Sequence, residues 1–325
     1  MRRSVSGWCI AGKPIDFGGM DGQRLRIGLI GWGTVGSALG ELVQHGSLPL
    51  DLACLAVRNP DRSDLPKGVE LVAPEETLST DVVVELAGGL EGPREWARAV
   101  LDRGMPYVTA NKALLATHGG ELAEMAERRV AALLGSASVG GGTPMIETTQ
   151  HLAASGEIEG IRGLLNATTT YILSAMGEGG TYQESLRAAQ AGGYAEADPS
   201  FDVDGRDAAQ KLAILASVAW GRWRAEREVD TTGIVGRSVG AGETVRLVAE
   251  ATKDTMTVAP MPLDPTDPLA RASGVESVLE VTMSDGTTFR TSGPGAGGHV
   301  TARAVYADLA RLAAGERPIL FGGGA

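Results

Sequence analysis

A short stretch of the chain, YAEADPSFDVDGRDAAQK (residues 194–211), combines carboxylates with one lysine in a pattern suited to acid–base chemistry. Asp207 lies four residues before Lys211, so on a helix the two side chains share a face and can pair. The stretch predicts a catalytic cluster, against the alternative of a solvated loop followed by an acid-rich helix N-terminus. The acids that precede the lysine are Glu196, Asp198, Asp202, Asp204 and Asp207.

A calcium loop is the second alternative, because DVDG supplies the alternating acids and the glycine of an EF-hand. With Ser200 at the first loop position, Gly205 takes the sixth and Lys211 the twelfth. The twelfth position normally supplies a bidentate glutamate, so a lysine there excludes this loop. Asp198 and Asp204 are expected to serve the turn and the helix start.

The lysines of the chain are few, because arginine carries most of the positive charge. They occupy positions 13, 67, 112, 211 and 253. Lys112 follows VTAN at the end of a predicted parallel strand, the edge where doubly wound sheets place ligands. A compact ammonium that can donate or lose a proton suits Lys112 and Lys211. A structural ion pair is the alternative for both.

A glycine-rich turn lies between a predicted strand and a predicted helix near the start of the chain. Gly31, Gly33 and Gly36 give the spacing G-x-G-x-x-G, which permits a tight turn, close approach of a pyrophosphate and close helix packing. This context favours dinucleotide binding over a merely tight turn. Arg58 follows the second strand, where an arginine suits the 2′-phosphate of NADP and an acid would suit NAD; the alternative is a solvated surface arginine.

The elements around these residues alternate between strand and helix from Arg24 to about residue 143. Predicted strands lie at 25–30, 51–57, 81–89 and 106–112, with helices at 35–43, 93–104 and 120–135. This rhythm predicts an α/β fold with a Rossmann-type, doubly wound parallel sheet. We expect a dinucleotide-binding domain over residues 24–143.

The rhythm changes after residue 143, where a second, α+β substrate domain is expected over residues 144–294. A strand over 157–165 is followed by a threonine-rich turn, then by helices at 182–193 and 208–220. Residues 275–293 predict a β-hairpin closed by Ser284–Gly286, and Pro260–Pro268 a proline-rich connector. The helix within residues 295–325, ending at Gly315, is expected to return to the cofactor domain.

Composition restricts the class of partner. The chain of 325 residues is 43% apolar and 21% charged, with a net charge of -11, which argues against nucleic acid and anionic membranes. No apolar run reaches the length of a membrane span. Two cysteines, Cys9 and Cys54, and four histidines without metal-ligand spacing make a disulfide framework or zinc site improbable and fit a reducing cytoplasm. Residues 1–23 are expected to be a loose extension, with Met20 an alternative start.

Several motifs together resemble the homoserine dehydrogenase family, from about Arg26 to Gly315. They are GLIGWGTVGSAL, AVRN, VVELAGGLEGPREWARAVLDRGMPYVTANKALLATHG, SASVGGGTPMI, NATTTYIL, GYAEADPSFDVDGRDAAQKLAILA and GPGAGGHVTARAV. The resemblance implies an NAD(P)-dependent oxidoreductase that interconverts L-homoserine and L-aspartate 4-semialdehyde by hydride transfer. It also implies a role in the biosynthesis of threonine and methionine, and a homodimer built through the second domain's sheet.

The resemblance also implies roles for individual positions. Lys211 is the acid/base beside the reacting oxygen, Asp207 helps to hold the substrate, Glu196 receives its ammonium and Lys112 lies between cofactor and substrate. The implied substrate pocket is lined by Tyr194, Thr168, Ala167 and Asp202. The implied cofactor contacts are Gly31, Gly33, Thr34, Val35, Gly36, Arg58, Gly88, Ala110, Gly193 and Gly295.

Four positions depart from the family pattern, and one of them is Gln210, which stands where a histidine is common. Ala167 replaces the glycine and Thr170 the second asparagine of NGTTNY, which motivates an alternative reading as a related enzyme for a different small amino or hydroxy acid. Ser136 replaces a glutamate beside a monovalent-cation loop, which makes that cation doubtful, and no other metal is expected. A catalytically silent NADP sensor is a further alternative, but it would not need Lys112, Glu196 and Lys211. No C-terminal ACT domain is expected.

Overall fold

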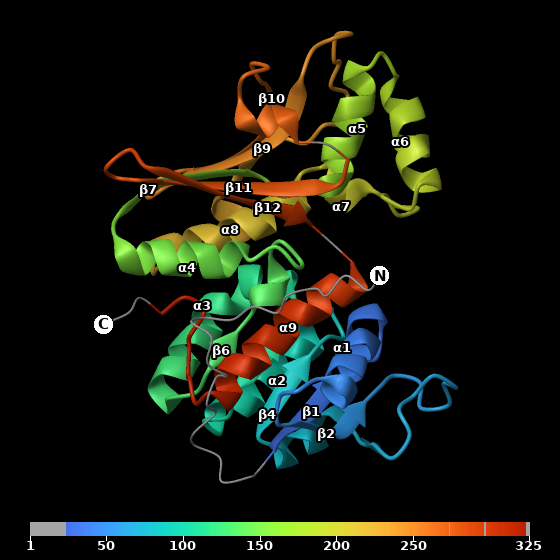
Figure 1. Ribbon diagram of the computed structural model, residues 1–325, viewed down its shortest axis with the longest axis vertical. Helices are drawn as coiled ribbons and strands as arrows, with labels where there is room; N and C mark the ends of the chain where they lie inside the picture. Colours follow the sequence, from blue (N-terminus) through green and yellow to red (C-terminus); the bar gives the residue numbers. More distant parts are fainter. Residues whose placement is uncertain (1–23, 273, 296, 323–325) are drawn as a thin grey trace, which may run out of the picture.

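The computed structural model describes residues 24–322 except 273 and 296, and within these it contains two six-stranded sheets, one above the other in Figure 1. The predicted extension over residues 1–23, including Cys9 and Met20, lies outside the described residues. No helix among the described residues is long and apolar enough to cross a membrane.

The first sheet is entirely parallel, with strand order β3-β2-β1-β4-β5-β6. Its central strands are apolar runs that are almost entirely buried, as expected when helices cover both faces, whereas the edge strand β3 is exposed. The strands are β1 (Leu25–Ile30), β2 (Leu50–Ala56), β3 (Glu70–Leu71), β4 (Val82–Glu85), β5 (Tyr107–Thr109) and β6 (Leu133–Leu134). This order is that of the Rossmann fold, so the predicted doubly wound sheet is confirmed.

Helices cover both faces of this sheet. One face packs on α1 (Thr34–His45) and α9 (Gly298–Ala313), and the other on α2 (Glu91–Asp102) and α3 (Lys112–Arg129). Figure 1 shows α9 beside α1, although the two helices are far apart in sequence. Beyond α9, Ile319 pairs in parallel with Leu133 of β6. The C-terminal helix thus packs on the first sheet.

The second sheet has the order β12-β11-β7-β9-β10-β8 and is antiparallel except for the last pair. The predicted hairpin is confirmed as β11 and β12. The strands are β7 (Ile158–Leu164), β8 (Asp230–Thr231), β9 (Val245–Thr252), β10 (Met256–Pro262), β11 (Glu276–Met283) and β12 (Thr288–Pro294). The helices between them are α4 (Met145–Ser155), α5 (Ala167–Gly177), α6 (Tyr182–Ala191), α7 (Ser200–Val203) and α8 (Arg206–Trp220).

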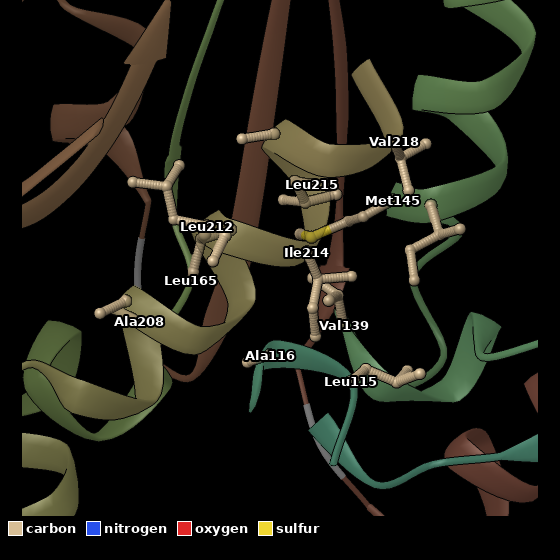
Figure 2. Close-up of a cluster of buried hydrophobic side chains, with 14 of the residues drawn as sticks. Leu115, Ala116, Val139, Met145, Leu165, Ala208, Leu212, Ile214, Leu215 and Val218 are labelled. Atoms are coloured by element: carbon tan, nitrogen blue, oxygen red, sulfur yellow. The ribbon is translucent and has the colours of Figure 1, made fainter. Parts of the chain in front are cut away.

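The two sheets share one hydrophobic core that passes through α8. Figure 2 shows Leu212, Ile214 and Leu215 of α8 among Leu115 of α3 and Met145 of α4. All five side chains are at most 1% exposed. Because helices from both halves of the chain bury their apolar faces against each other, the seam between the sheets is a fixed packing interface. The positions of α3, α4 and α8 relative to one another are therefore fixed by packing.

Three expectations about local structure were wrong. The helix expected over 120–135 instead runs from Lys112 to Arg129, and Leu133–Leu134 form β6. Pro260 and Pro262 lie in β10 and not in a connector. The carbonyl of Val258 accepts from the N–H of Thr232, which lies on the side of β10 opposite β9. The backbone N–H and C=O groups of the even-numbered residues of β10 therefore face away from β9. β8 pairs only with Thr257 and Val258, so prolines farther along that edge remove no ladder hydrogen bond. The threonine-rich run likewise forms the first turn of α5, capped by the Asn166 side chain on the Thr169 N–H.

A buried carboxylate ties α9 to the loop that follows β6. Asp308 is 1% exposed, and its two oxygens accept from the backbone N–H of Ser136 at 3.1 Å and from its hydroxyl at 2.6 Å. Burial, with the nearby carboxylate of Glu147, raises the pKa of Asp308 to about 7, while the bonds from Ser136 lower it. Ser136, where the family has a glutamate, therefore anchors the C-terminal helix.

This anchor predicts a pH-dependent stability. The pKa of Asp308 is raised on folding. Its contribution to the free energy of unfolding is therefore intact below about pH 4 and is lost as pH rises to about 7. We expect the unfolding free energy of the protein to fall, relative to that of Asp308→Asn, by roughly 1.4 kcal/mol per pH unit across this window. Urea titrations from pH 4 to 9 measure it; a constant difference between the two proteins would contradict the prediction. Ser136→Ala should extend the fall to higher pH.

Candidate active site

The carboxyl ends of β4 and β5 lie side by side, and Ala110 and Lys112, just after β5, line a candidate site. Glu85 ends β4, is fully buried, and accepts hydrogen bonds from Ala87 N and Gly88 N at 2.8 Å and from the Thr109 hydroxyl at 2.8 Å. Burial nevertheless raises the pKa of Glu85. Sequence reasoning missed this residue. The acid within an apolar strand was the available signal, since a buried carboxylate must find several donors.

The acid-rich stretch supplies the opposite wall. Residues 200–203 form α7, and Asp207 lies in the first turn of α8 with Lys211 one turn later. The Lys211 ammonium donates to Asp207 Oδ2 at 2.7 Å and to the carbonyl of Leu165 at 2.8 Å. The predicted i,i+4 pair is therefore formed. Asp198 accepts from Ser200 N at 3.1 Å, as expected of a turn residue, and α7 occupies the segment that a calcium loop would need.

Asp207 joins the two halves of the molecule through Lys112. Its second oxygen, Oδ1, lies 3.3 Å from the Lys112 ammonium at the start of α3. The Asp207 side chain is 7% exposed. Burial opposes its charge, but Lys211 and Lys112 hold the pKa of Asp207 below its usual value. One ionised carboxylate therefore bridges two ammonium groups, one from each half of the chain.

Asn166, which sequence reasoning missed, connects the acids. Its amide nitrogen donates to Asp202 Oδ1 at 2.7 Å and to Asp207 Oδ2 at 2.8 Å. Its amide oxygen accepts from Thr169 N at 2.8 Å. Burial, with the charge of Asp207, raises the pKa of Asp202, although the bond from Asn166 lowers it. The signal in the sequence was an asparagine at a helix N-cap, which says nothing about where the amide nitrogen points.

A cavity of about 420 Å³ opens between these walls. All eight residues predicted for catalysis or substrate binding line it: Lys211, Lys112, Asp207, Glu196, Tyr194, Thr168, Ala167 and Asp202. Three predicted cofactor positions, Ala110, Gly193 and Gly295, line it too. Sequence reasoning missed Ala137, Ser138, Gly141, Asn166, Ala195 and Thr301.

The rim of the cavity is less buried than its floor. Glu196 is exposed, and Tyr194 is 45% exposed with its ring 5.0 Å from that of Tyr171. The Thr168 hydroxyl donates to the Tyr194 carbonyl at 2.7 Å, which fixes the rim to the start of α5. Of the two departures in NATTTY, only Ala167 lines the cavity; Thr170 is buried and donates to the Asn166 carbonyl at 3.1 Å. The Thr170 departure therefore acts behind the cavity wall.

The glycine-rich turn fits a dinucleotide. Gly31 has φ of 105°, and a side chain there would meet Ala87 N at 2.7 Å, while one at Gly36 would overlap the Gly31 carbonyl oxygen. At Gly33, by contrast, no described atom lies within 4 Å of the position of a β-carbon. The turn is thus closed where the chain packs and open where a pyrophosphate would approach, and α1 begins there without a side-chain cap.

The remaining predicted cofactor positions lie along the same edge of the sheet. Thr34 and Val35 open α1, Gly88 follows β4 and Arg58 is exposed just after β2. The first residue of α9, Gly298, packs against Thr34 so closely that a side chain at 298 would overlap that of Thr34. Residues for a dinucleotide therefore lie beside the cavity that holds the lysines. Within the described part of the chain, no group of three His, Cys, Asp or Glu side chains could hold a metal ion.

Comparison with known proteins shows similarity to homoserine dehydrogenases over both halves of the chain. A family model described as homoserine dehydrogenase matches residues 144–310, and one described as its NAD binding domain matches residues 31–134. The chain is 38% identical to a homoserine dehydrogenase of Synechocystis sp., covering 89% of this chain and 73% of that protein. It is 36% identical to one of Corynebacterium glutamicum, covering 89% and 72%.

Solved structures agree with the sequence comparisons. A homoserine dehydrogenase from Thiobacillus denitrificans superposes with a TM-score of 0.84 at 31% identity, over 90% of this chain and 74% of that chain. A hyperthermophilic archaeal homoserine dehydrogenase in complex with NADPH gives 0.82 at 28% identity, over 91% of this chain and 100% of that chain. With the fold, the dinucleotide turn and two family models spanning both halves, the chain belongs to the homoserine dehydrogenase family.

Proposed function

We propose that this protein interconverts L-homoserine and L-aspartate 4-semialdehyde by an NADP-dependent hydride transfer. The observation that carries the proposal is the bridge of Asp207 between Lys211 and Lys112 in a cavity beside a dinucleotide turn. Reduction of a carbonyl group needs a proton donor at its oxygen and the hydride of the cofactor at its carbon, so the two sites must adjoin. The family and the relatives' names support this substrate.

Lys211 is the proposed acid/base. An ammonium has three donors, and two of those of Lys211 are directed at Asp207 and Leu165. The third is left for the reacting oxygen of the substrate, where it stabilises developing negative charge and supplies a proton in the direction of reduction. In the direction of oxidation the same nitrogen accepts the proton of the hydroxyl. Bound NADP supplies the hydride acceptor and NADPH the donor.

The carboxylates of the cavity suit an amino-acid substrate. Asp202 and Glu196 line the cavity and are not paired with Lys112 or Lys211 in the structure. We assign them to the substrate ammonium, which they can bind by charge-assisted hydrogen bonds. Thr168 and Ala167 open α5 at the same wall, where the methyl group of Ala167 borders the substrate.

The preference for NADP is assigned to Arg58. Its guanidinium stands at the end of β2, where doubly wound enzymes contact the ribose 2′ position, and it is exposed and available. A guanidinium binds a phosphate by bidentate hydrogen bonds. The archaeal relative with NADPH is consistent with this choice.

The proposal extends to organisation. We infer a cofactor domain over residues 24–143, a substrate and dimerisation domain over 144–294, a returning C-terminal segment over 295–325 and a homodimer in the cytoplasm. On the face of the second sheet opposite the helices, Arg162 pairs with Glu250 at 2.9 Å and Asp267 at 2.8 Å, a polar surface that a second copy could cover. Light scattering after gel filtration should give twice the chain mass of 33.5 kDa; a monomer at micromolar concentration would refute the dimer.

The substrate is tested by steady-state rates with L-homoserine and NADP at neutral and alkaline pH, against related amino and hydroxy acids. We expect L-homoserine to give the highest kcat/KM of the panel. Negligible turnover of L-homoserine at both pH values, with measurable turnover of another compound, would assign the protein to a different substrate.

Removal of the proposed acid/base gives a sharp test. Lys211→Ala should lower kcat by at least about 100-fold, because general acid–base catalysis contributes that much or more. NADPH affinity, measured by fluorescence titration, should stay within about threefold because Lys211 contacts the substrate side. Lys253→Ala, in the turn between β9 and β10, is the control and should be unchanged. Normal turnover by Lys211→Ala would overturn the assignment.

Arg58→Ala should change cofactor choice. Loss of charge-assisted bonds to a 2′-phosphate should lower kcat/KM for NADPH about 10- to 100-fold, with little effect on NADH, which has no such phosphate. Lys67→Ala removes a positive charge from the same β2–β3 connection and serves as the matched control. Equal losses with both cofactors would show that Arg58 does not read the 2′ position.

A further inference from the structure

Asn166 occupies the centre of the acid cluster in a way that leaves its side chain no freedom. It is 4% exposed, and it uses both hydrogens of its amide nitrogen and accepts one hydrogen bond on its amide oxygen. The oxygen is committed to the N–H of Thr169, which starts α5. The nitrogen therefore has to face Asp202 and Asp207, and one hydrogen is available for each carboxylate.

We propose that Asn166 is a positioning residue that holds Asp202 and Asp207 together while keeping them in different roles. Without a donor between them, two carboxylates that reach one nitrogen at 2.7 and 2.8 Å would repel each other and turn apart. The proposal rests on the function proposed above and adds a residue to it. Asn166 acts through the two acids and is not assigned a contact with the substrate.

The contacts of the two acids show how the roles differ. Asp207 Oδ2 accepts hydrogen bonds from Asn166 and Lys211, and Oδ1 lies 3.3 Å from the Lys112 ammonium. Each of its two oxygens therefore faces a lysine. Asp202 accepts a hydrogen bond from Asn166 at 2.7 Å, forms no ion pair with Lys112 or Lys211, and borders the cavity. Asn166 thereby fixes a paired acid next to the proton donor and a free acid next to the substrate ammonium.

The titratable groups that face the cluster come from four segments. They are Asp202 of α7, Asp207 and Lys211 of α8, Lys112 of α3, and Tyr194 and Glu196 of the rim. Removing the amide donor should make ionisation of the two acids harder, because their repulsion is no longer offset by a hydrogen bond. The activity that needs ionised acids should then begin at higher pH.

Two variants keep the helix cap and remove the bridge. Asn166→Ser and Asn166→Asp both accept from Thr169 N, but neither can donate to two carboxylates, and Asp adds a third negative charge. We expect kcat/KM for L-homoserine at pH 7 to fall about 10- to 100-fold for Ser and further for Asp. The acidic limb of the pH profile should move to higher pH in the order wild type, Ser, Asp. NADPH affinity should be unchanged.

A second measurement does not depend on activity. Acids with a higher pKa in the folded variant bind more protons there, so its unfolding free energy relative to wild type should decline as pH rises above about 4, the ordinary pKa of an aspartate. Thr181→Ser changes the N-cap of α6, where the hydroxyl accepts from Glu184 N, and is the control for capping alone. It should show neither the pH shift nor the loss of kcat/KM.

The outcomes separate the proposals. If wild type does not turn over L-homoserine, the proposed function fails, while the pH dependence of unfolding still tests Asn166. If both Asn166 variants lose thermal stability but keep the wild-type pH profile, KM and pH dependence of unfolding, Asn166 is only a helix cap and the inference is overturned.

Discussion

The Asp207 carboxylate is a buried charge, and most of the site follows from the need to compensate it. Breaking a buried ion pair costs about 3–5 kcal/mol, so the groups that satisfy Asp207 are held as firmly as a core side chain. Lys211 comes from the same helix, Lys112 from α3 of the other half, and Asn166 from the start of α5. One carboxylate thus fixes three elements around the cavity, and any substrate enters a site whose charges are already arranged.

The packing behind the site makes that arrangement possible. Leu115 of α3 and Leu212 of α8 belong to one continuous core, so the helices that carry Lys112 and Asp207 cannot separate without exposing apolar surface. Ser136 and Asp308 complete the frame by tying α9 to the loop that brings Ser138 to the cavity. The glycine-rich turn and the cavity that holds the two lysines are consequently parts of a single packed body.

Much of the first sheet was predictable, because short apolar strands alternating with helices have few topological solutions. The glycine turn was predictable from its spacing between a strand and a helix. The structure gives the physical reason for that spacing, since a side chain at Gly31 or Gly36 would collide with the backbone. The second half was harder. β9 and β10 were not predicted, and prolines at 260 and 262 are compatible with a strand only because the edge of β10 that faces away from β9 is unpaired at those residues. Edge position is a property of the sheet, not of the segment.

The sequence by itself determined the contacts that span one helical turn and the residue types available for chemistry. The pairing of Asp207 with Lys211 follows from helix geometry, which places residues four apart on one face. Only the tertiary structure decided that Lys112 reaches the same carboxylate, that Asn166 turns its nitrogen toward two acids, and that Asp308 finds Ser136. These contacts join residues far apart in the chain, and they exist because packing of whole helices and sheets brings their backbones together, which no local spacing encodes.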